Sequence, residues 1–370
     1  MFHISLSYVF SLGLVSAIAA TGAQANETDL IVSKDCAERT ACFATISEAL
    51  EETDGSPTLI LIEPGDYNEK VHVTQPNVTL SGAAPDKTRL HHDLVARDAK
   101  PFHRDGWGTP GSATLTINAA NVTISDITVE NTFDYLANDA KDAEDPEKVR
   151  DSQAVAVFLD TDSDRVRIDN VVMKAYQDTF FAHGERAYVS NGAIYGNVDF
   201  IFGDGQVVFE AVDIVSRPRG QTLPAGEIQS YITAPSTQIA DDYGLVFLNC
   251  RLLREEGVPD RSVALGRPWH PTTTFPDGRY ADPDAIGYTA FIDTYMDGHI
   301  IKRGWTTMNG TARDGSKSDI FRPEDSRFYE RGSTGPGAQP LDLYKERRAL
   351  PSSDSLESIR DAVLGDWDPS

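Results

Sequence analysis

The chain has 370 residues, of which 40% are hydrophobic and 24% charged, a composition typical of a folded globular protein. Its 57 acidic and 33 basic residues give a formal charge of -24, and such a surface repels nucleic acids and anionic membranes, so we expect neither as a partner. No internal segment is long and apolar enough to predict a membrane span.

The N-terminal residues have the pattern of a signal peptide. Residues 4–20 are mostly apolar, and Ala23-Gln24-Ala25 fits a small-residue cleavage site, although the start carries only His3 in place of Lys or Arg. We therefore expect residues 1–25 to be removed near Ala25. The mature chain, residues 26–370, is then expected to be a single catalytic domain exported to the periplasm or the medium.

The next features are a cysteine pair and a short helix. Cys36 and Cys42 lie six residues apart around a polar turn. Export permits a disulfide between them, but the spacing alone does not distinguish a disulfide from two thiols. Residues 45–52 place apolar side chains at helical spacing, which predicts a helix that caps the N-terminal end of a repeat fold.

Short β-branched segments broken by Asn, Asp and Gly recur through the middle of the chain. Aligning Leu80, Ile124, Ile168, Val189, Phe209 and Leu248 gives gaps of 44, 44, 21, 20 and 39 residues. We interpret these gaps as multiples of a repeat of roughly 20–22 residues. This predicts an all-β, right-handed parallel β-helix. A β-sandwich would also contain short strands, but it would not explain the near-constant gaps.

Two segments depart from the repeat. Residues 131–151 are charged and are expected to form an excursion loop. From about residue 322 to 370 the repeat is lost, and this segment is predicted to pack along the side of the β-helix.

Cys250 lies in an apolar segment and is expected to be a buried packing residue.

Two carboxylates are expected to meet on the β-helix. Asp178 and Asp199 are 21 residues apart, which is one repeat, so they should lie on adjacent coils about 5 Å apart. Because both sit among apolar residues, one should remain protonated near neutral pH while the other stays ionised. A neutral acid beside an anionic nucleophile suits the cleavage of an ester that releases an alkoxide.

Further candidate residues surround this pair. Gln153 precedes Gln177 by 24 residues, about one repeat, and should lie one coil earlier. Arg267 is expected to hold Asp199 ionised and oriented through charge-assisted hydrogen bonds. Trp269 offers a flat apolar wall on which a sugar ring can rest.

These segments resemble those of the pectinesterases (pectin methylesterases), in particular the bacterial ones. The resemblance covers nearly all of the mature chain and rests on motifs in the same order. They are Gly65-Asp66-Tyr67-Asn68-Glu69, Trp107-Gly108-Thr109, Gln153-Ala154-Val155-Ala156-Val157, Tyr176-Gln177-Asp178-Thr179, Asp199-Phe200-Ile201-Phe202-Gly203, Thr233-Ala234-Pro235-Ser236 and Leu265-Gly266-Arg267-Pro268-Trp269.

The resemblance implies a pectin-lyase-like β-helix and a carboxylic ester hydrolase that demethylates pectin, releasing methanol. It implies that Asp199 forms an acyl-enzyme and that Asp178 is the general acid and base. Gln177 and Gln153 would stabilise the oxyanion, while Arg267 orients Asp199. No metal or cofactor is expected, and members are typically monomers. Further groove positions implied by the resemblance are Trp269, Phe202, Phe181, Val198, Thr109, Thr272 and Met308.

One departure and several alternatives accompany this interpretation. Phe180-Phe181 stands where many relatives have a Tyr, which leaves the detail of one subsite open. Two carboxylates about 5 Å apart also suit a retaining glycosidase, which would cut the polysaccharide chain. A relative acting on another acyl substrate, such as a thioester, or a non-catalytic carbohydrate-binding β-helix, would share the fold. A pectate lyase would need an acidic calcium cluster, which the sequence does not show.

Overall fold

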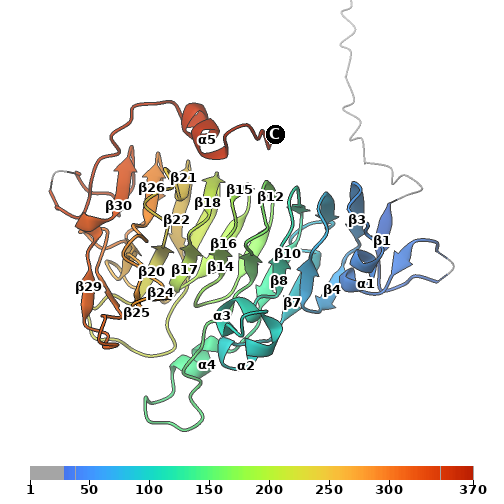
Figure 1. The fold of residues 1–370 in the computed structure, drawn as a ribbon, viewed down its shortest axis with the longest axis horizontal. Coiled ribbons are helices and arrows are strands. Elements are labelled where there is room, and N and C mark those ends of the chain that lie inside the picture. Colours follow the sequence, from blue (N-terminus) through green and yellow to red (C-terminus); the bar gives the residue numbers. More distant parts are fainter. Residues whose placement is uncertain (1–28, 38, 342, 370) are drawn as a thin grey trace, which may run out of the picture.

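The computed structural model describes residues 29–37, 39–341 and 343–369. The proposed signal peptide, residues 1–25, lies outside them. The body is a parallel β-helix in which the chain winds repeatedly through three sheets (Figure 1). All pairings within these three sheets are parallel, while two short hairpins are antiparallel. The predicted parallel β-helix is confirmed.

The three sheets run side by side along the β-helix. Sheet A contains, in spatial order, β2 (Cys42–Phe43), β1 (Leu30–Val32), β3 (Thr58–Ile62), β6 (Val78–Ser81), β9 (Thr123–Ser125), β12 (Val166–Asp169), β15 (Arg186–Ser190), β18 (Gln206–Glu210), β21 (Leu245–Leu248), β26 (Tyr288–Ile292) and β30 (Arg327–Arg331). Sheet B contains β27 (Tyr295–Met296), β22 (Arg251–Arg254), β19 (Asp213–Ser216), β16 (Ala193–Gly196), β13 (Val172–Lys174), β10 (Thr128–Asn131), β7 (Thr88–His92) and β4 (Gly65–Asn68).

Sheet C carries the site described below. It contains β23 (Val263–Gly266), β20 (Ser230–Pro235), β17 (Val198–Gly203), β14 (Phe180–Ala182), β11 (Val157–Leu159), β8 (Leu115–Ile117) and β5 (Val71–Val73). The hairpins are β24 (Thr272–Phe275) with β25 (Gly278–Ala281), and β28 (Met308–Gly310) with β29 (Asp319–Phe321). The helical segments are α1 (Ile46–Glu51), α2 (Ala96–Ala99), η1 (Lys100–Phe102), α3 (Gly108–Gly111), α4 (Tyr135–Asp139), η2 (Pro323–Asp325) and α5 (Leu356–Leu364).

The six segments that revealed the repeat are consecutive neighbours in sheet A. Leu80 pairs with Ile124, and Ile124 with Ile168, so each 44-residue gap is a single coil. Our interpretation of those gaps as two repeats was therefore wrong. The strands fix the ladder, whereas the connections between them can lengthen at small entropic cost. One such connection holds α2, η1 and α3, and another, the predicted excursion loop, holds α4. Figure 1 shows α2, α3 and α4 together below the strands.

The alignment was also wrong by one residue at Leu248. Phe209 pairs with Phe247, and their rings stack with centroids 4.5 Å apart inside the β-helix. Leu248 instead points to the outer face of sheet A. Because side chains alternate between the two faces of a strand, this shift moves a residue from the interior to the exterior.

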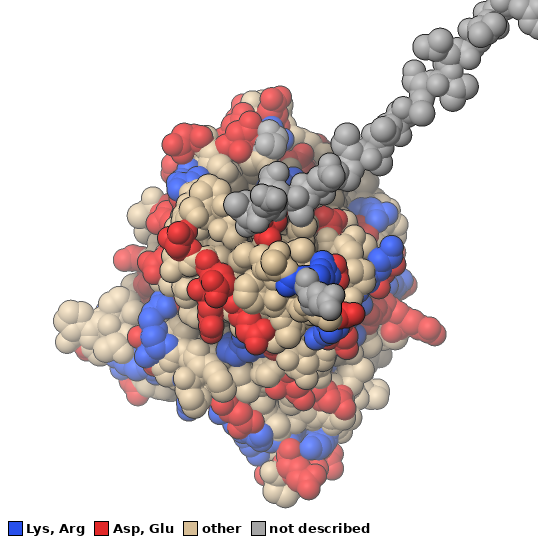
Figure 2. Space-filling model, turned by 90° about the vertical axis from the view of Figure 1, so that its right-hand side faces the viewer, with Lys and Arg blue, Asp and Glu red and all other residues tan. Residues whose placement is uncertain are grey.

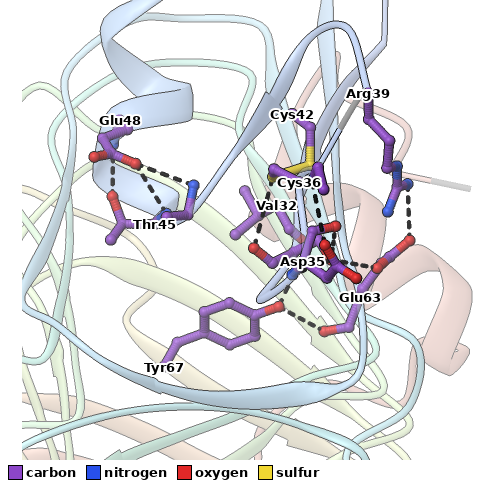
Figure 3. Close-up of a disulfide and its surroundings, with 12 residues drawn as sticks. Val32, Asp35, Cys36, Arg39, Cys42, Thr45, Glu48, Glu63 and Tyr67 are labelled. Atoms are coloured by element: carbon purple, nitrogen blue, oxygen red, sulfur yellow. Dashed lines mark hydrogen bonds and ion pairs between the residues drawn. A yellow bond between two sulfur atoms is a disulfide. The ribbon is translucent and has the colours of Figure 1, made fainter.

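The N-terminal end is closed by α1 and a disulfide loop. Ile46 and Ala49 of α1 are buried in the core, and Thr45 caps the helix in a capping box with Glu48. The carboxylate of Glu69 also accepts hydrogen bonds from the backbone N–H groups at the start of α1. The structure answers the open cysteine question: Cys36 and Cys42 form a disulfide (Figure 3).

The C-terminal segment follows the outside of sheet A. β30 adds one more strand to that sheet, so the repeat extends past residue 322, where we expected it to end. Beyond it, Ile359, Val363 and Leu364 of α5 pack against outward-facing side chains of sheet A. In Figure 1, α5 appears next to the arrow tips of the sheet A strands. This apolar contact fixes the chain after it has left the β-helix.

The surface carries both signs of charge. Figure 2, which looks at the end that bears α1, shows acidic and basic side chains interspersed over uncharged surface. Within the described residues, no helix combines the length and the apolar character needed to cross a bilayer.

Candidate active site

Backbone geometry turns Asp178 and Asp199 outward on adjacent coils of sheet C. Both have left-handed backbone conformations, with φ of 67° and 51°. The N–H of Asp178 donates to the carbonyl of Val198 on the next coil, at 3.1 Å. The pairing of β17 with β20 shifts between Val198 and Ile201, which lets both Phe200 and Ile201 point into the core. Such a bulge re-aims the neighbouring side chain, here Asp199.

The two carboxyl groups are almost removed from water, and each residue is 8% exposed. Burial raises the pKa of Asp178 well above its usual range, and the negative charge of Asp199 raises it further. Arg267 acts in the opposite direction without cancelling these effects. Asp178 is therefore suited to carry a proton, as expected for one member of the pair.

Arg267 follows β23 and forms a two-pronged ion pair with Asp199. Its Nε donates to Oδ1 at 2.8 Å and its Nη2 to Oδ2 at 2.6 Å. Burial alone would lower the pKa of Arg267, but the charge and hydrogen bonds of Asp199 outweigh it and the pKa is raised. The guanidinium also lies over the ring of Tyr231, 3.8 Å from its centroid. Asp199 is thus held by a guanidinium whose own position is stabilised by its contact with the Tyr231 ring.

The two candidate glutamines are neighbours on successive coils. The N–H of Ala154 donates to the carbonyl of Gln177 at 3.2 Å, which places Gln153 beside Gln177 as the 24-residue spacing predicted. Ser152 donates from Oγ to the side-chain oxygen of Gln177, also at 3.2 Å. This contact leaves the amide NH2 of Gln177 available as a donor, and both glutamine side chains are partly exposed.

An aromatic floor lies beside the carboxylates on the outer face of sheet C. Phe158, Phe181 and Phe202 stand on three adjacent strands, and the rings of Phe181 and Phe202 stack with centroids 4.2 Å apart. Trp269 packs edge-on against Phe202, with centroids 5.6 Å apart. Phe181 and Phe202 are nearly buried, whereas Trp269 keeps part of its ring exposed. An exposed indole above an apolar floor can receive a sugar ring.

A cavity of about 600 Å³ adjoins this floor. Trp269, Phe181 and Thr272 line it, together with Trp107 and a hydrogen-bonded pair formed by His183 and Asp204, 2.7 Å apart. The cavity is not lined by either catalytic candidate, so it represents the neighbouring part of the groove. We take the carboxylate pair as the candidate reaction centre, because an ion-paired Asp199 and a buried Asp178 with a raised pKa lie there.

The remaining predicted groove residues lie at the margins. Val198 opens β17 and is partly exposed, next to Asp199. Thr109 is a partly exposed residue of α3, two positions after Trp107. Met308 opens the β28–β29 hairpin, which is joined to the β24–β25 hairpin by a 2.7 Å hydrogen bond between the hydroxyl groups of Thr272 and Thr311.

Sequence reasoning did not assign a role to several residues that the fold brings here. Tyr231 pairs with Val198 across β17 and β20 and supports Arg267, and a register alignment of those strands would have located it. His183 and Asp204 are 21 residues apart, the same one-repeat signal that identified the aspartates. Tyr135 of α4 stacks on Tyr176 at 5.2 Å, a contact that depends on the path of a loop and leaves no signal in the repeat.

The described residues contain no group of three or more His, Cys, Asp or Glu side chains that could hold a metal ion. The polar atoms of the site are instead matched in pairs, Arg267 with Asp199 and Ser152 with Gln177. The arrangement offers a nucleophile, an acid and amide donors from its own side chains.

Comparison with known proteins gives the family. The pectinesterase family model matches residues 29–321. The chain belongs to the pectinesterase family. Pectinesterase A of Dickeya chrysanthemi is 42% identical over 372 residues, covering 99% of each chain. The family resemblance seen in the sequence is confirmed, and this pectinesterase is an enzyme.

Solved structures of pectin methylesterases have the same fold as this chain. The pectin methylesterase of Erwinia chrysanthemi matches with a TM-score of 0.85 and 42% identity, covering 94% of this chain and 99% of that one. The enzyme of Yersinia enterocolitica matches with a TM-score of 0.78 and 43% identity, over 88% and 99% of the two chains. A pectin methylesterase solved in complex with a hexasaccharide has a TM-score of 0.85 and 42% identity, over 94% and 99%.

Proposed function

We propose that this pectinesterase removes methyl groups from pectin through a covalent intermediate on Asp199. The observation that carries the proposal is that two adjacent carboxyl groups have different environments. Asp199 is bound by two hydrogen bonds from a cation, whereas burial and the neighbouring charge raise the pKa of Asp178. One group is thereby an oriented anion and the other a neutral acid, the two forms that ester cleavage by attack and protonation requires.

In the first half of the reaction, a carboxylate oxygen of Asp199 attacks the carbonyl carbon of the methyl ester. The negative charge that develops on the carbonyl oxygen is stabilised by the amide NH2 groups of Gln177 and Gln153. When the tetrahedral intermediate collapses, the bond to the methoxy oxygen breaks and that oxygen takes the proton of Asp178. Methanol leaves, and Asp199 is joined to the sugar carboxyl group as an anhydride.

In the second half, Asp178 is a carboxylate and accepts a proton from a water molecule that attacks the same carbonyl carbon. Collapse breaks the bond to Asp199 and releases the galacturonate as a free acid. Asp178 again carries a proton and Asp199 its negative charge. Arg267 keeps the leaving carboxylate in place through both halves.

The substrate is proposed to lie along the outer face of sheet C, with a sugar ring against Trp269. The aromatic floor, the cavity lined by Thr272 and Trp107, and the hexasaccharide bound by the related pectin methylesterase support this placement. Thr109, Val198 and Met308 are proposed to border the same groove. We also propose that the chain acts as an exported monomer after loss of residues 1–25.

The test measures methanol, acid and reducing ends together when the mature protein is mixed with highly methylated pectin. Equal release of methanol and acid without new reducing ends is expected. Asp199→Asn and Asp178→Asn should each lower the rate at least about a hundredfold. Asp126→Asn is the matched control, because Asp126 has a similar left-handed backbone, φ 56°, on a different sheet edge. New reducing ends, or full activity in Asp199→Asn, would exclude this mechanism.

A further inference from the structure

A cleft on sheet C, beyond the aromatic floor, is centred on Lys70 and His72. Two cavities of about 230 and 340 Å³ adjoin there, and these two residues line both. Phe102 and Arg104, from the connection that holds α2, η1 and α3, form the opposite wall of the smaller cavity. The cleft is separate from the 600 Å³ cavity beside Trp269, which the other side of the same connection borders.

Strand register places this cleft in line with the catalytic groove. His72 pairs with Thr116, Thr116 with Phe158, and Phe158 with Phe181. These residues form one outward row across β5, β8, β11 and β14. Three strand spacings separate His72 from Phe181, about 14 Å. Lys70 precedes His72 by two residues and so faces the same side of the strand.

Lys70 is a mostly buried cation without an acidic partner. Its ammonium donates to the backbone carbonyl of Ala113, and it lies 6.0 Å from the ring centroid of Phe102. Within the described residues Lys70 forms no ion pair, and burial lowers its pKa to about 8. A buried charge without a counter-charge is unfavourable, so binding of an anion next to Lys70 would be stabilising.

The surrounding titratable groups do not supply that counter-charge. Asp160 already pairs with Arg104, which donates two hydrogen bonds to its carboxylate. Glu69 is committed to the start of α1. Glu51, at the outer margin of the larger cavity, is exposed and makes no ion pair with Lys70. The other nearby titratable side chains are His72, His92 and His103, all with pKa values lowered by burial.

We propose that this cleft binds the carboxylate of a demethylated galacturonate residue and forms a second polysaccharide site next to the ester-binding groove. The proposal rests on the proposed function, because the reaction itself creates such carboxylates. In a chain with a formal charge of -24, an unpaired cation in a cavity offsets local repulsion of an anionic polymer. A de-esterified stretch bound here keeps the remaining esters of the same polymer close to Asp199.

Calorimetric titration of the whole protein with fully demethylated oligogalacturonate tests the proposal. Lys70→Gln keeps a donor for Ala113 but removes the charge, and should weaken binding about tenfold or more. Lys87→Gln is the matched control, because Lys87 is an exposed lysine in the turn before β7 and its loss changes the net charge equally. Fully methylated oligosaccharide should bind Lys70→Gln and the unchanged protein alike. Equal weakening by both substitutions, or by neither, would overturn the proposal.

Two further measurements are made on the unchanged protein, with Lys70→Gln as the comparison for the first. Binding of oligogalacturonate should weaken as the pH rises through about 8, because Lys70 then loses its proton, and Lys70→Gln should lack this step. Acetate should bind far more weakly; acetate binding as tight as that of the oligosaccharide would show a general carboxylate site and overturn the polysaccharide assignment. Methanol release is measured separately, so a failure of the proposed function is recognised independently.

Discussion

Arg267 and Asp199 are 68 residues apart in the chain, yet the guanidinium holds both carboxylate oxygens, at 2.8 and 2.6 Å. The contact exists because β17, β20 and β23 are consecutive strands of sheet C. Arg267 therefore reaches Asp199 across two strand spacings, with Tyr231 of the intervening strand beneath it.

This geometry predicts that Arg267→Lys lowers kcat about a hundredfold. A lysine keeps the positive charge but cannot donate to both oxygens in one plane, so Asp199 loses its orientation. Methanol release at saturating pectin measures the effect, with circular dichroism as the folding control. Full activity of the lysine variant would show that charge alone is required.

The proximity of the two candidate catalytic aspartates was predictable because it depends on strand register alone. Residues one coil apart lie on adjacent strands, and the 21-residue spacing of Asp178 and Asp199 equals one coil. Arg267 was expected beside Asp199 from its chemistry and not from the 20–22-residue spacing, because the coils that separate them are longer: Val198 pairs with Tyr231, and Tyr231 with Ala264, each 33 residues further along the chain. The 44-residue coils were misjudged for the same reason: loop length varies freely where strand pairing does not.

Contacts made by loops could not be predicted from the sequence repeat. Tyr135 arrives at the site on α4, which is held to the body by two hydrogen bonds between Arg219 and Asp139, at 2.9 and 2.8 Å. Nothing in the spacing of Asp139 and Arg219, 80 residues apart, indicates that they meet. Leu248 shows a second limit of prediction from the repeat. An alignment error of one residue within a strand assigns an outward-facing side chain to the interior.

Asp178 is predicted to reduce the stability of the protein while enabling its activity. An aspartic acid whose pKa is higher in the folded state stabilises the fold below the unfolded value of 3.8, and this contribution is lost as the pH rises through the folded value. Each unit of the shift corresponds to about 1.4 kcal/mol. Asp178→Asn, which cannot ionise, should therefore be more stable than the unchanged protein at pH 8 and closer to it at pH 5.

The measurement is the free energy of unfolding in urea at the two pH values. Asp126→Asn provides the control for replacing an aspartate in a left-handed turn. A stability difference that is the same at pH 5 and pH 8 would show that ionisation of Asp178 is not its source.

Gln177 is predicted to act on kcat more than on KM. Gln177→Met preserves the length of the side chain but removes the amide donor, so the developing oxyanion loses one hydrogen bond. The expected loss in kcat is about a hundredfold. Initial rates of methanol release over a range of pectin concentrations separate the two constants. If Gln177→Met raised KM and left kcat intact, Gln177 would be a binding residue rather than an oxyanion donor.

The C-terminal segment is predicted to depend on a buried ion pair. Arg347 and Glu330 are both 0% exposed and their charged groups lie 2.6 Å apart. Arg347 also donates to the carbonyls of Ile301, Lys302 and Gly337, so it joins the last strand to the preceding coil. Arg347→Met would leave Glu330 with only the indole N–H of Trp305 as a donor, at 3.3 Å.

Removing one member of a buried pair leaves an uncompensated charge and costs about 3–5 kcal/mol. We therefore expect Arg347→Met to lower the free energy of unfolding by that amount in urea titrations. The double variant Arg347→Met with Glu330→Gln should recover part of the loss, because no charge then remains buried. Arg360→Met, on the partly exposed face of α5, is the control and should change stability little. If the single and double variants were equally unstable, the hydrogen bonds of Arg347 to the backbone, and not its pairing with Glu330, would be what holds the segment.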